Sequence, residues 1–108
     1  KLLDLFDEAL PHKGRLKVTS SGELNAKVWF IKENLTNIGS AEGNAIVIPD
    51  KSVSKRHAGI KVQDARFELA DYGSTNGVMV NGQRITKQFL KSGDVLSIGA
   101  VEMEFTLK

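Results

Sequence analysis

Two Asn-Gly dipeptides, at residues 76–77 and 81–82, constrain the fold of this chain more than any other feature, and the apolar run Val-Met-Val at 78–80 separates them. Asn and Gly adopt positive φ at low steric cost, so Asn-Gly is typical of the tight turns that join antiparallel strands. We therefore expect the chain to arrive as a strand that ends near residue 70, turn, run briefly extended and turn again.

The first of these turns carries three small polar side chains, Ser74, Thr75 and Asn76, with Gly73 before them and Gly77 after them. Loops on a rigid β scaffold are where recognition residues collect. This turn is therefore predicted to form part of a binding rim. Asn76 has two compatible interpretations: it is the positive-φ residue of its turn, or it offers its amide to a ligand.

Short apolar runs interrupted by turn residues continue along most of the chain. We expect a loop from residue 86 through Leu90 and strands at 16–19, 28–31, 35–39, 46–48, 57–62, 66–70, 78–80, 83–85, 95–98 and 101–107. Many short strands with turn signals between them are typical of an all-β sandwich.

Residues 2–10 carry a helical pattern instead, with apolar residues at helical spacing and Asp4, Asp7 and Glu8 between them. Pro11 and Gly14 end the pattern. We expect residues 1–14 to form an amphipathic helix and linker, and residues 15–108 to form the β-sandwich domain. Two interpretations of the helix stay open: an appendage or linker remnant, and a docking helix for a partner. Because the chain begins with Lys, we also expect it to be one module of a longer protein.

Composition excludes several classes of function. The net charge is only +2, which does not favour nucleic-acid binding. The chain has no cysteine and only two histidines, so we expect no metal site, no cofactor and no catalytic centre. No apolar run approaches the roughly 20 residues that span a bilayer. We expect a cytoplasmic protein without membrane insertion.

Four motifs follow one another in a single order: Ile-Gly at 38–39, Ser-Lys-Arg-His at 54–57, the Ser-Thr-Asn-Gly and Asn-Gly turns at 74–82, and Gly-Asp before Val-Leu-Ser-Ile-Gly at 93–99. In this order and spacing the chain resembles the forkhead-associated (FHA) domain from about residue 16 to residue 108. The resemblance implies a sandwich of two twisted antiparallel sheets with eleven strands. It also implies that loops at one end hold a phosphothreonine within an extended peptide.

The resemblance assigns roles to particular residues. Ser54 would donate its hydroxyl to the phosphate with Lys55 as a nearby cation, Thr75 would lie beside the phosphorylated residue, and Asn76 would clamp the peptide main chain. The other motif residues would be structural: Gly39, His57, Gly77, Asn81 and Gly82. From the residues alone, Ser54 could also be a simple turn residue that closes the segment 49–53.

The chain departs from the family pattern at one position. In the family, the glycine that ends the third strand is usually followed by an arginine that grips the phosphate, whereas here Gly39 is followed by Ser40. A serine keeps one hydrogen-bond donor but brings no charge. Ser40 is still one of five residues on the loops that we expect to bind the partner, the others being Ser54, Lys55, Thr75 and Asn76. It is interpreted as a replacement that does not itself bind the phosphate, with a surrogate phosphate ligand as the alternative. Lys55 or Arg56 would have to compensate, and a lysine acts as a point charge without the planar fork of a guanidinium.

Two functional hypotheses remain. The first is a non-catalytic interaction module for signal transduction, which binds a phosphothreonine-containing protein or peptide, the substrate of a Ser/Thr kinase. The second is a phosphate-independent structural or assembly domain of a larger signalling, secretion or transporter protein, which associates with itself or with a fixed partner.

Overall fold

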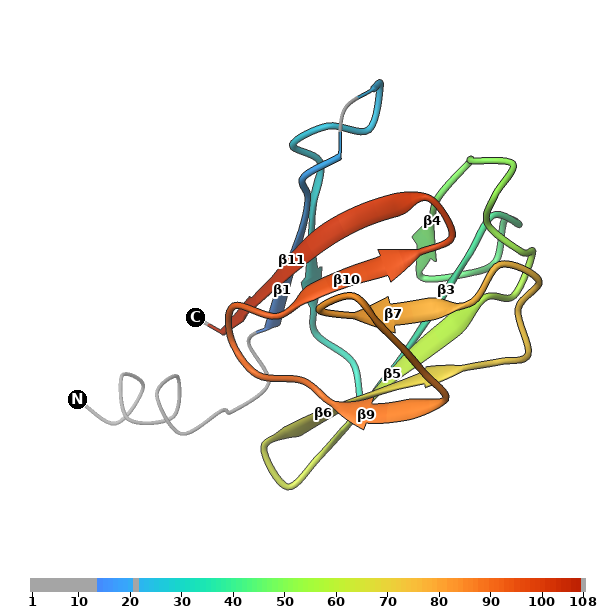
Figure 1. Ribbon diagram of the computed structural model, residues 1–108. Helices are drawn as coiled ribbons and strands as arrows, with labels where there is room; N and C mark the ends of the chain where they lie inside the picture. The colour runs from blue at the N-terminus through green and yellow to red at the C-terminus, as the bar shows by residue number, and fades with distance from the viewer. Residues whose placement is uncertain (1–13, 21, 108) are drawn as a thin grey trace.

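The structure, a computed structural model, describes residues 14–20 and 22–107 and contains eleven strands in this part of the chain (Figure 1). The strands are β1 (Gly14–Val18), β2 (Val28–Ile31), β3 (Leu35–Gly39), β4 (Ile46–Val47), β5 (Ala58–Gln63), β6 (Arg66–Asp71), β7 (Val78–Val80), β8 (Gln83–Ile85), β9 (Lys87–Phe89), β10 (Val95–Ile98) and β11 (Val101–Leu107). The helix expected at residues 2–10 lies outside the described residues. The domain boundary expected at 14/15 remains a prediction.

The strands form two layers, which confirms the predicted all-β sandwich. One sheet has six strands in the order β2-β1-β11-β10-β7-β8, and the other has five in the order β4-β3-β5-β6-β9. Every pairing is antiparallel except one, because β4 runs parallel to β3 with Ile38 opposite Ile46. The expectation of purely antiparallel sheets was wrong at this edge.

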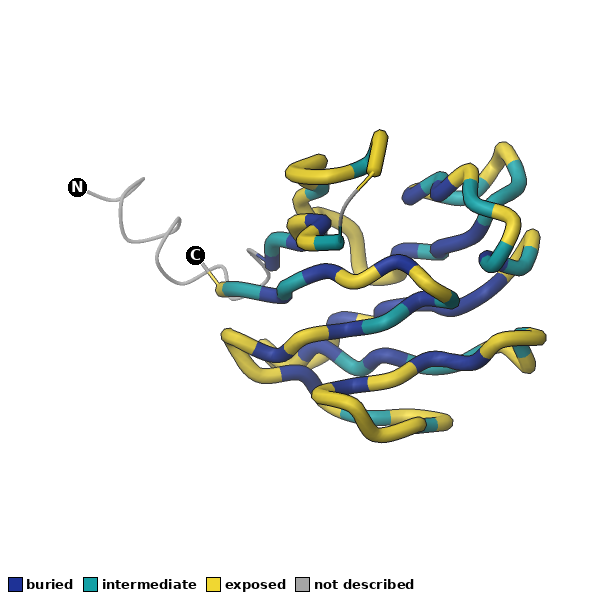
Figure 2. Tube along the Cα trace, turned by 45° about the horizontal axis from the view of Figure 1, so that its top comes forward, coloured by how far each residue is buried: buried dark blue, intermediate teal, exposed yellow. Residues whose placement is uncertain are grey.

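The core lies between the two sheets and follows from the period-2 pattern of the strands. In β5, for example, Ala58, Ile60 and Val62 are buried while Lys61 is exposed. Figure 2 shows the same alternation along other strands, with exposed residues concentrated in the loops. Each large apolar side chain that is fully buried contributes about 1.5–3 kcal/mol to folding, so the two apolar faces hold the layers together.

Gly14 already belongs to β1, two residues before the predicted start of that strand. A Cβ atom there would lie 2.8 Å from the ring of Phe67 and 2.9 Å from the ring of Phe105. These two rings pack at a centroid distance of 5.1 Å in the core. The absence of a side chain at Gly14 therefore lets β1 approach this aromatic pair.

The predicted loop at residues 86–90 contains a strand instead, β9, which pairs with β6 and places Phe89 opposite Glu68. Sequence periodicity did not reveal β9 because it is a short edge strand. Its residues are half-buried or exposed, and Phe89 is 45% exposed.

The two Asn-Gly pairs behave differently. Asn81 and Gly82 both adopt positive φ, at 52° and 84°, and form the predicted two-residue turn between β7 and β8. At the first pair only Gly77 has positive φ, at 86°. The interpretation of Asn76 as a positive-φ turn residue was therefore wrong, and its side chain has another use.

No helix within residues 14–20 and 22–107 is long and apolar enough to span a bilayer.

Candidate binding site

Three loops meet at one end of the sandwich, on the right in Figure 1: the β3–β4, β4–β5 and β6–β7 connections. Together they surround an open hollow of about 680 Å³. Its lining residues are Ser40, Pro49, Asp50, Lys51, Val53, Ser54, Lys55 and Thr75. The structure thus brings together four of the five predicted ligand residues, from positions far apart in the sequence.

His57 lies beneath these loops, with no exposed surface, and joins two of them. The backbone N–H of Ser54 donates to Nδ1 of His57 over 2.9 Å. Nδ1 must therefore be the unprotonated nitrogen, so Nε2 carries the hydrogen and donates to the carbonyl of Gly77 over 2.8 Å. One neutral ring thereby fixes the β4–β5 loop to the β6–β7 loop, and both of its nitrogens are satisfied.

Ser54 makes a second tie between the same two loops. Its Oγ accepts a hydrogen bond from the backbone N–H of Thr75 over 3.1 Å. Because Oγ is the acceptor in this bond, its own hydrogen is left to donate to a ligand. Ser54 is half-buried and Thr75 is exposed, so this donor stands at the floor of the hollow and Thr75 at its rim.

Ser40 reaches the hollow because the β3–β4 loop is fastened to the β4–β5 loop. The N–H of Ser40 donates to the carbonyl of Ser54 over 3.0 Å, and Nδ2 of Asn44 donates to the carbonyl of Lys55 over 2.8 Å. A Cβ at Gly39 would overlap the carbonyl oxygen of Lys55. Glycine at position 39 is thus required by close backbone approach, not by an unusual dihedral angle.

Asn76 lies next to the hollow without lining it. Its Nδ2 donates to the carbonyl of Ser52 over 2.8 Å, which ties the β6–β7 loop to the β4–β5 loop a third time. Its side-chain oxygen remains available as an acceptor. Ser74, in the turn that was predicted to form part of a binding rim, caps its own loop by accepting a hydrogen bond from the N–H of Gly77 over 2.9 Å.

Asp50 and Ser52 fix the segment 49–53, which forms one wall of the hollow. From the sequence alone, this segment was treated only as a turn. Ser52 donates to Oδ1 of Asp50 from its hydroxyl over 2.6 Å and from its backbone N–H over 2.8 Å. These two hydrogen bonds, the one from the hydroxyl more than the one from the backbone, lower the pKa of Asp50 below its ordinary value of 3.8. Partial burial raises this pKa and the charge of Lys51 lowers it, both by less. Oγ of Ser52 also accepts from the N–H of Ala100, in the β10–β11 turn, over 2.9 Å.

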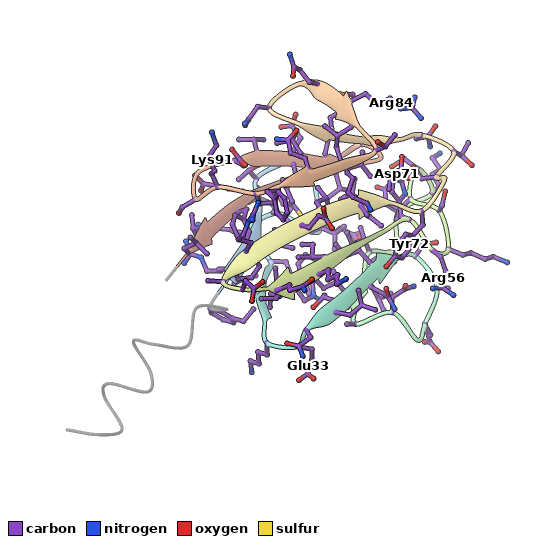
Figure 3. The ribbon with its side chains drawn as sticks, turned by 90° about the horizontal axis from the view of Figure 1, so that it is seen from below. Glu33, Arg56, Asp71, Tyr72, Arg84 and Lys91 are labelled. Carbon is purple, nitrogen blue, oxygen red and sulfur yellow. The ribbon has the colours of Figure 1, made fainter. Side chains whose placement is uncertain are left out.

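Two further cations lie close to this end of the domain. The guanidinium of Arg56 lies 5.8 Å from the centroid of the Tyr72 ring (Figure 3), a cation–π arrangement. The guanidinium of Arg84 lies over Gly77, where an added Cβ would be 2.8 Å from its central carbon. Neither lines the hollow, so its cations are Lys51 and Lys55.

The hollow combines hydroxyl donors and two ammonium groups with one carboxylate, that of Asp50. The hydroxyl and ammonium groups suit an anion with several acceptor oxygens, since such a group needs converging donors and a cation. Within residues 14–20 and 22–107, no group of three or more His, Asp or Glu side chains is placed to hold a metal ion.

Comparison with known proteins agrees with this geometry. Residues 36–99, more than half of the chain, match the family model of the FHA domain. The chain is 31% identical over 98 residues to the oxoglutarate dehydrogenase inhibitor of Corynebacterium glutamicum, an alignment that covers 91% of this chain and 68% of that protein.

Two solved structures are similar throughout the sandwich. One comes from a structural and functional analysis of phosphothreonine-dependent FHA domain interactions (TM-score 0.81, 28% identity, 89% of this chain and 97% of that one). The other is Mycobacterium tuberculosis EmbR in complex with a low-affinity phosphopeptide (TM-score 0.81, 28% identity, 89% of this chain and 24% of that one).

Proposed function

The chain belongs to the FHA domain family, and from this premise we propose that it is a non-catalytic interaction module that binds a phosphothreonine-containing protein or peptide. The phosphate would lie in the hollow, against Ser54 and Lys55, with Thr75 beside the phosphorylated residue. The oxygen of Asn76 would accept a hydrogen bond from the peptide main chain. A Ser/Thr kinase would supply the phosphate, and the cytoplasm is the compartment we expect.

The observation that carries this proposal is the bond between Ser54 Oγ and the N–H of Thr75. It leaves the serine hydrogen free to donate, and it holds the two loops at a fixed separation beside the ammonium of Lys55. A phosphate monoester carries about −1.5 to −2 charges at neutral pH. A charge-assisted hydrogen bond from an oriented donor contributes about 1.5–3 kcal/mol.

Ser40 sets the expected strength of binding. It lines the hollow where the family usually has an arginine, and it offers one neutral donor in place of a charged fork. Losing a charge-assisted bond of about 1.5–3 kcal/mol lowers affinity roughly tenfold to a hundredfold. We therefore expect phosphate-dependent binding that is weaker than in relatives that carry the arginine.

The test is a titration of a phosphothreonine peptide library, and of the same peptides without phosphate, by fluorescence anisotropy. The phosphorylated peptides should bind and their twins should not. Ser54→Ala should lower affinity at least about tenfold, whereas Ser97→Ala, on half-buried Ser97 of β10, should leave it unchanged. Because Ser54→Ala also removes an acceptor from Thr75, a thermal melt must show that the variant is folded. Equal affinity for both peptide sets would refute the proposal.

A phosphate-independent assembly role is the second candidate, and the exposed edge strand β2 is the observation that favours it. Phe30 is 55% exposed and Val28 37% exposed on the same face of this strand. Unpaired edges with apolar side chains are templates for pairing with another chain. Sedimentation of the wild type and of Phe30→Lys tests this role: a concentration-dependent dimer that the substitution abolishes would support assembly, and a monomer in both would exclude self-association.

A further inference from the structure

A second hollow, of about 500 Å³, adjoins the one described above and shares two of its lining residues, Pro49 and Asp50. Its other walls come from the β1–β2 hairpin, through Glu23 and Leu24, and from the β10–β11 turn, through Ala100 and Val101. None of the motif residues of the chain contributes to it.

The chemistry of the second hollow differs from that of the first. Its apolar surface comes from Leu24, Pro49 and Val101, and its ionisable groups are two carboxylates, Glu23 and Asp50. Ser52 directs both of its hydrogen bonds to Oδ1 of Asp50, so Oδ2 is left to accept from a ligand. This carboxylate is charged at neutral pH, as an ordinary aspartate is, and the hydrogen bonds from Ser52 lower its pKa further.

The shared wall is held in place from both sides. Ser52, two residues after Asp50, accepts a hydrogen bond from the N–H of Ala100 in the wall of the second hollow. Its carbonyl accepts from Asn76 of the β6–β7 loop, on the side of the first hollow. Asp50 therefore occupies a fixed position between the two hollows, where its charge repels a phosphate and attracts a cation.

We propose that the second hollow binds a lysine or arginine side chain of the same phosphopeptide; this inference rests on the proposed function. The basic residue would lie within about four residues of the phosphothreonine, always on the same side of it. An extended peptide advances about 3.3 Å per residue, so adjoining hollows are within this reach. The aliphatic stem would pack on Leu24 and Val101, and the cation would lie between Glu23 and Asp50. The preferred partner is then a phosphothreonine with a basic residue on one flank.

The test uses phosphothreonine peptides with an alanine background and a single lysine moved through the four positions on each side. Lysine should raise affinity by about twofold to fivefold at one or two positions on a single side, as expected for an ion pair that includes the exposed Glu23. Glu23→Gln should remove this gain and leave the affinity for the all-alanine phosphopeptide unchanged. Glu33→Gln is the matched control (Glu33 is labelled in Figure 3), because it removes the same charge from the β2–β3 connection and should preserve the gain.

The outcomes separate the two proposals. Phosphate-dependent binding that is indifferent to the position of lysine, or a gain that survives Glu23→Gln, overturns the basic-residue site and leaves the proposed function standing. Equal binding of phosphorylated and unphosphorylated peptides overturns both. As a direct readout, the backbone amide resonances of Leu24 and Val101 should shift with the best lysine peptide and stay in place with its alanine parent.

Discussion

Replacing Ser40 by arginine tests the proposed phosphate site most directly. Ser40 lines the open hollow between Ser54, Lys55 and Thr75, and its backbone is fixed to the carbonyl of Ser54. The guanidinium of the Ser40→Arg variant would therefore extend from a fixed backbone into the open hollow. No buried side chain has to move, because Ser40 is half-buried at the rim.

The expected gain follows from the bonds that the guanidinium can make. Each charge-assisted bond to phosphate contributes about 1.5–3 kcal/mol, and a bidentate arginine makes two. Ordering the side chain costs up to about 2 kcal/mol. Asp50, in the same hollow, competes for the guanidinium and reduces the gain further. A net gain of about 1.5–3 kcal/mol raises affinity roughly tenfold to a hundredfold.

The assay is calorimetric titration of the wild type and three variants with one phosphothreonine peptide and its unphosphorylated twin. Ser40→Lys adds charge without the planar fork and should give a smaller gain, and Ser40→Gln adds length without charge and should give none. If Ser40→Arg gives no gain, or the same gain for both peptides, the hollow is not the phosphate site and the proposal fails.

Three further predictions concern stability. His57→Ala should lower the free energy of unfolding by about 2–4 kcal/mol in a urea titration, because it removes a buried ring and both hydrogen bonds that join the loops. Gly39→Ala should be comparably destabilising in the same titration, since its Cβ would overlap the rigid carbonyl of Lys55. The hydrogen bonds from Ser52 hold the pKa of Asp50 below its ordinary 3.8, so the stability they provide is present above that pH and is lost as the pH falls through the lowered value. Asp50→Asn should accordingly flatten the acid limb of a stability–pH profile, and an unchanged limb would contradict this.

The sequence predicted those parts of the fold that depend on local chemistry. The β7–β8 turn followed from the tolerance of Asn81 and Gly82 for positive φ, and the strands of the core followed from alternating burial. β9 was missed because none of its three residues is buried and its one apolar side chain, Phe89, is exposed. The parallel pairing of β4 was missed because nothing in a two-residue strand specifies the direction of its neighbour.

The site was only partly visible in the sequence. Ser40, Ser54, Lys55 and Thr75 were singled out through spaced motifs, which report a family resemblance and not a geometry. The hydrogen bond of Ser52 to Ala100 joins residues 48 positions apart, and no local pattern predicts such a contact. The second hollow was invisible for the same reason, since three separate segments form its walls.

The loops that form the first hollow are joined by backbone–backbone hydrogen bonds and by side-chain bonds to backbone groups. The side-chain bonds separate two kinds of residue. His57 and Asn76 each connect the β4–β5 loop to the β6–β7 loop, whereas Lys55 makes no such connection through its side chain. Loops that are already fixed lose little conformational entropy when a ligand binds, so the bonds within the site raise affinity even where they do not touch the ligand. Loss of His57 should therefore weaken binding and folding together, while loss of the Lys55 ammonium should weaken binding alone and reduce its dependence on salt.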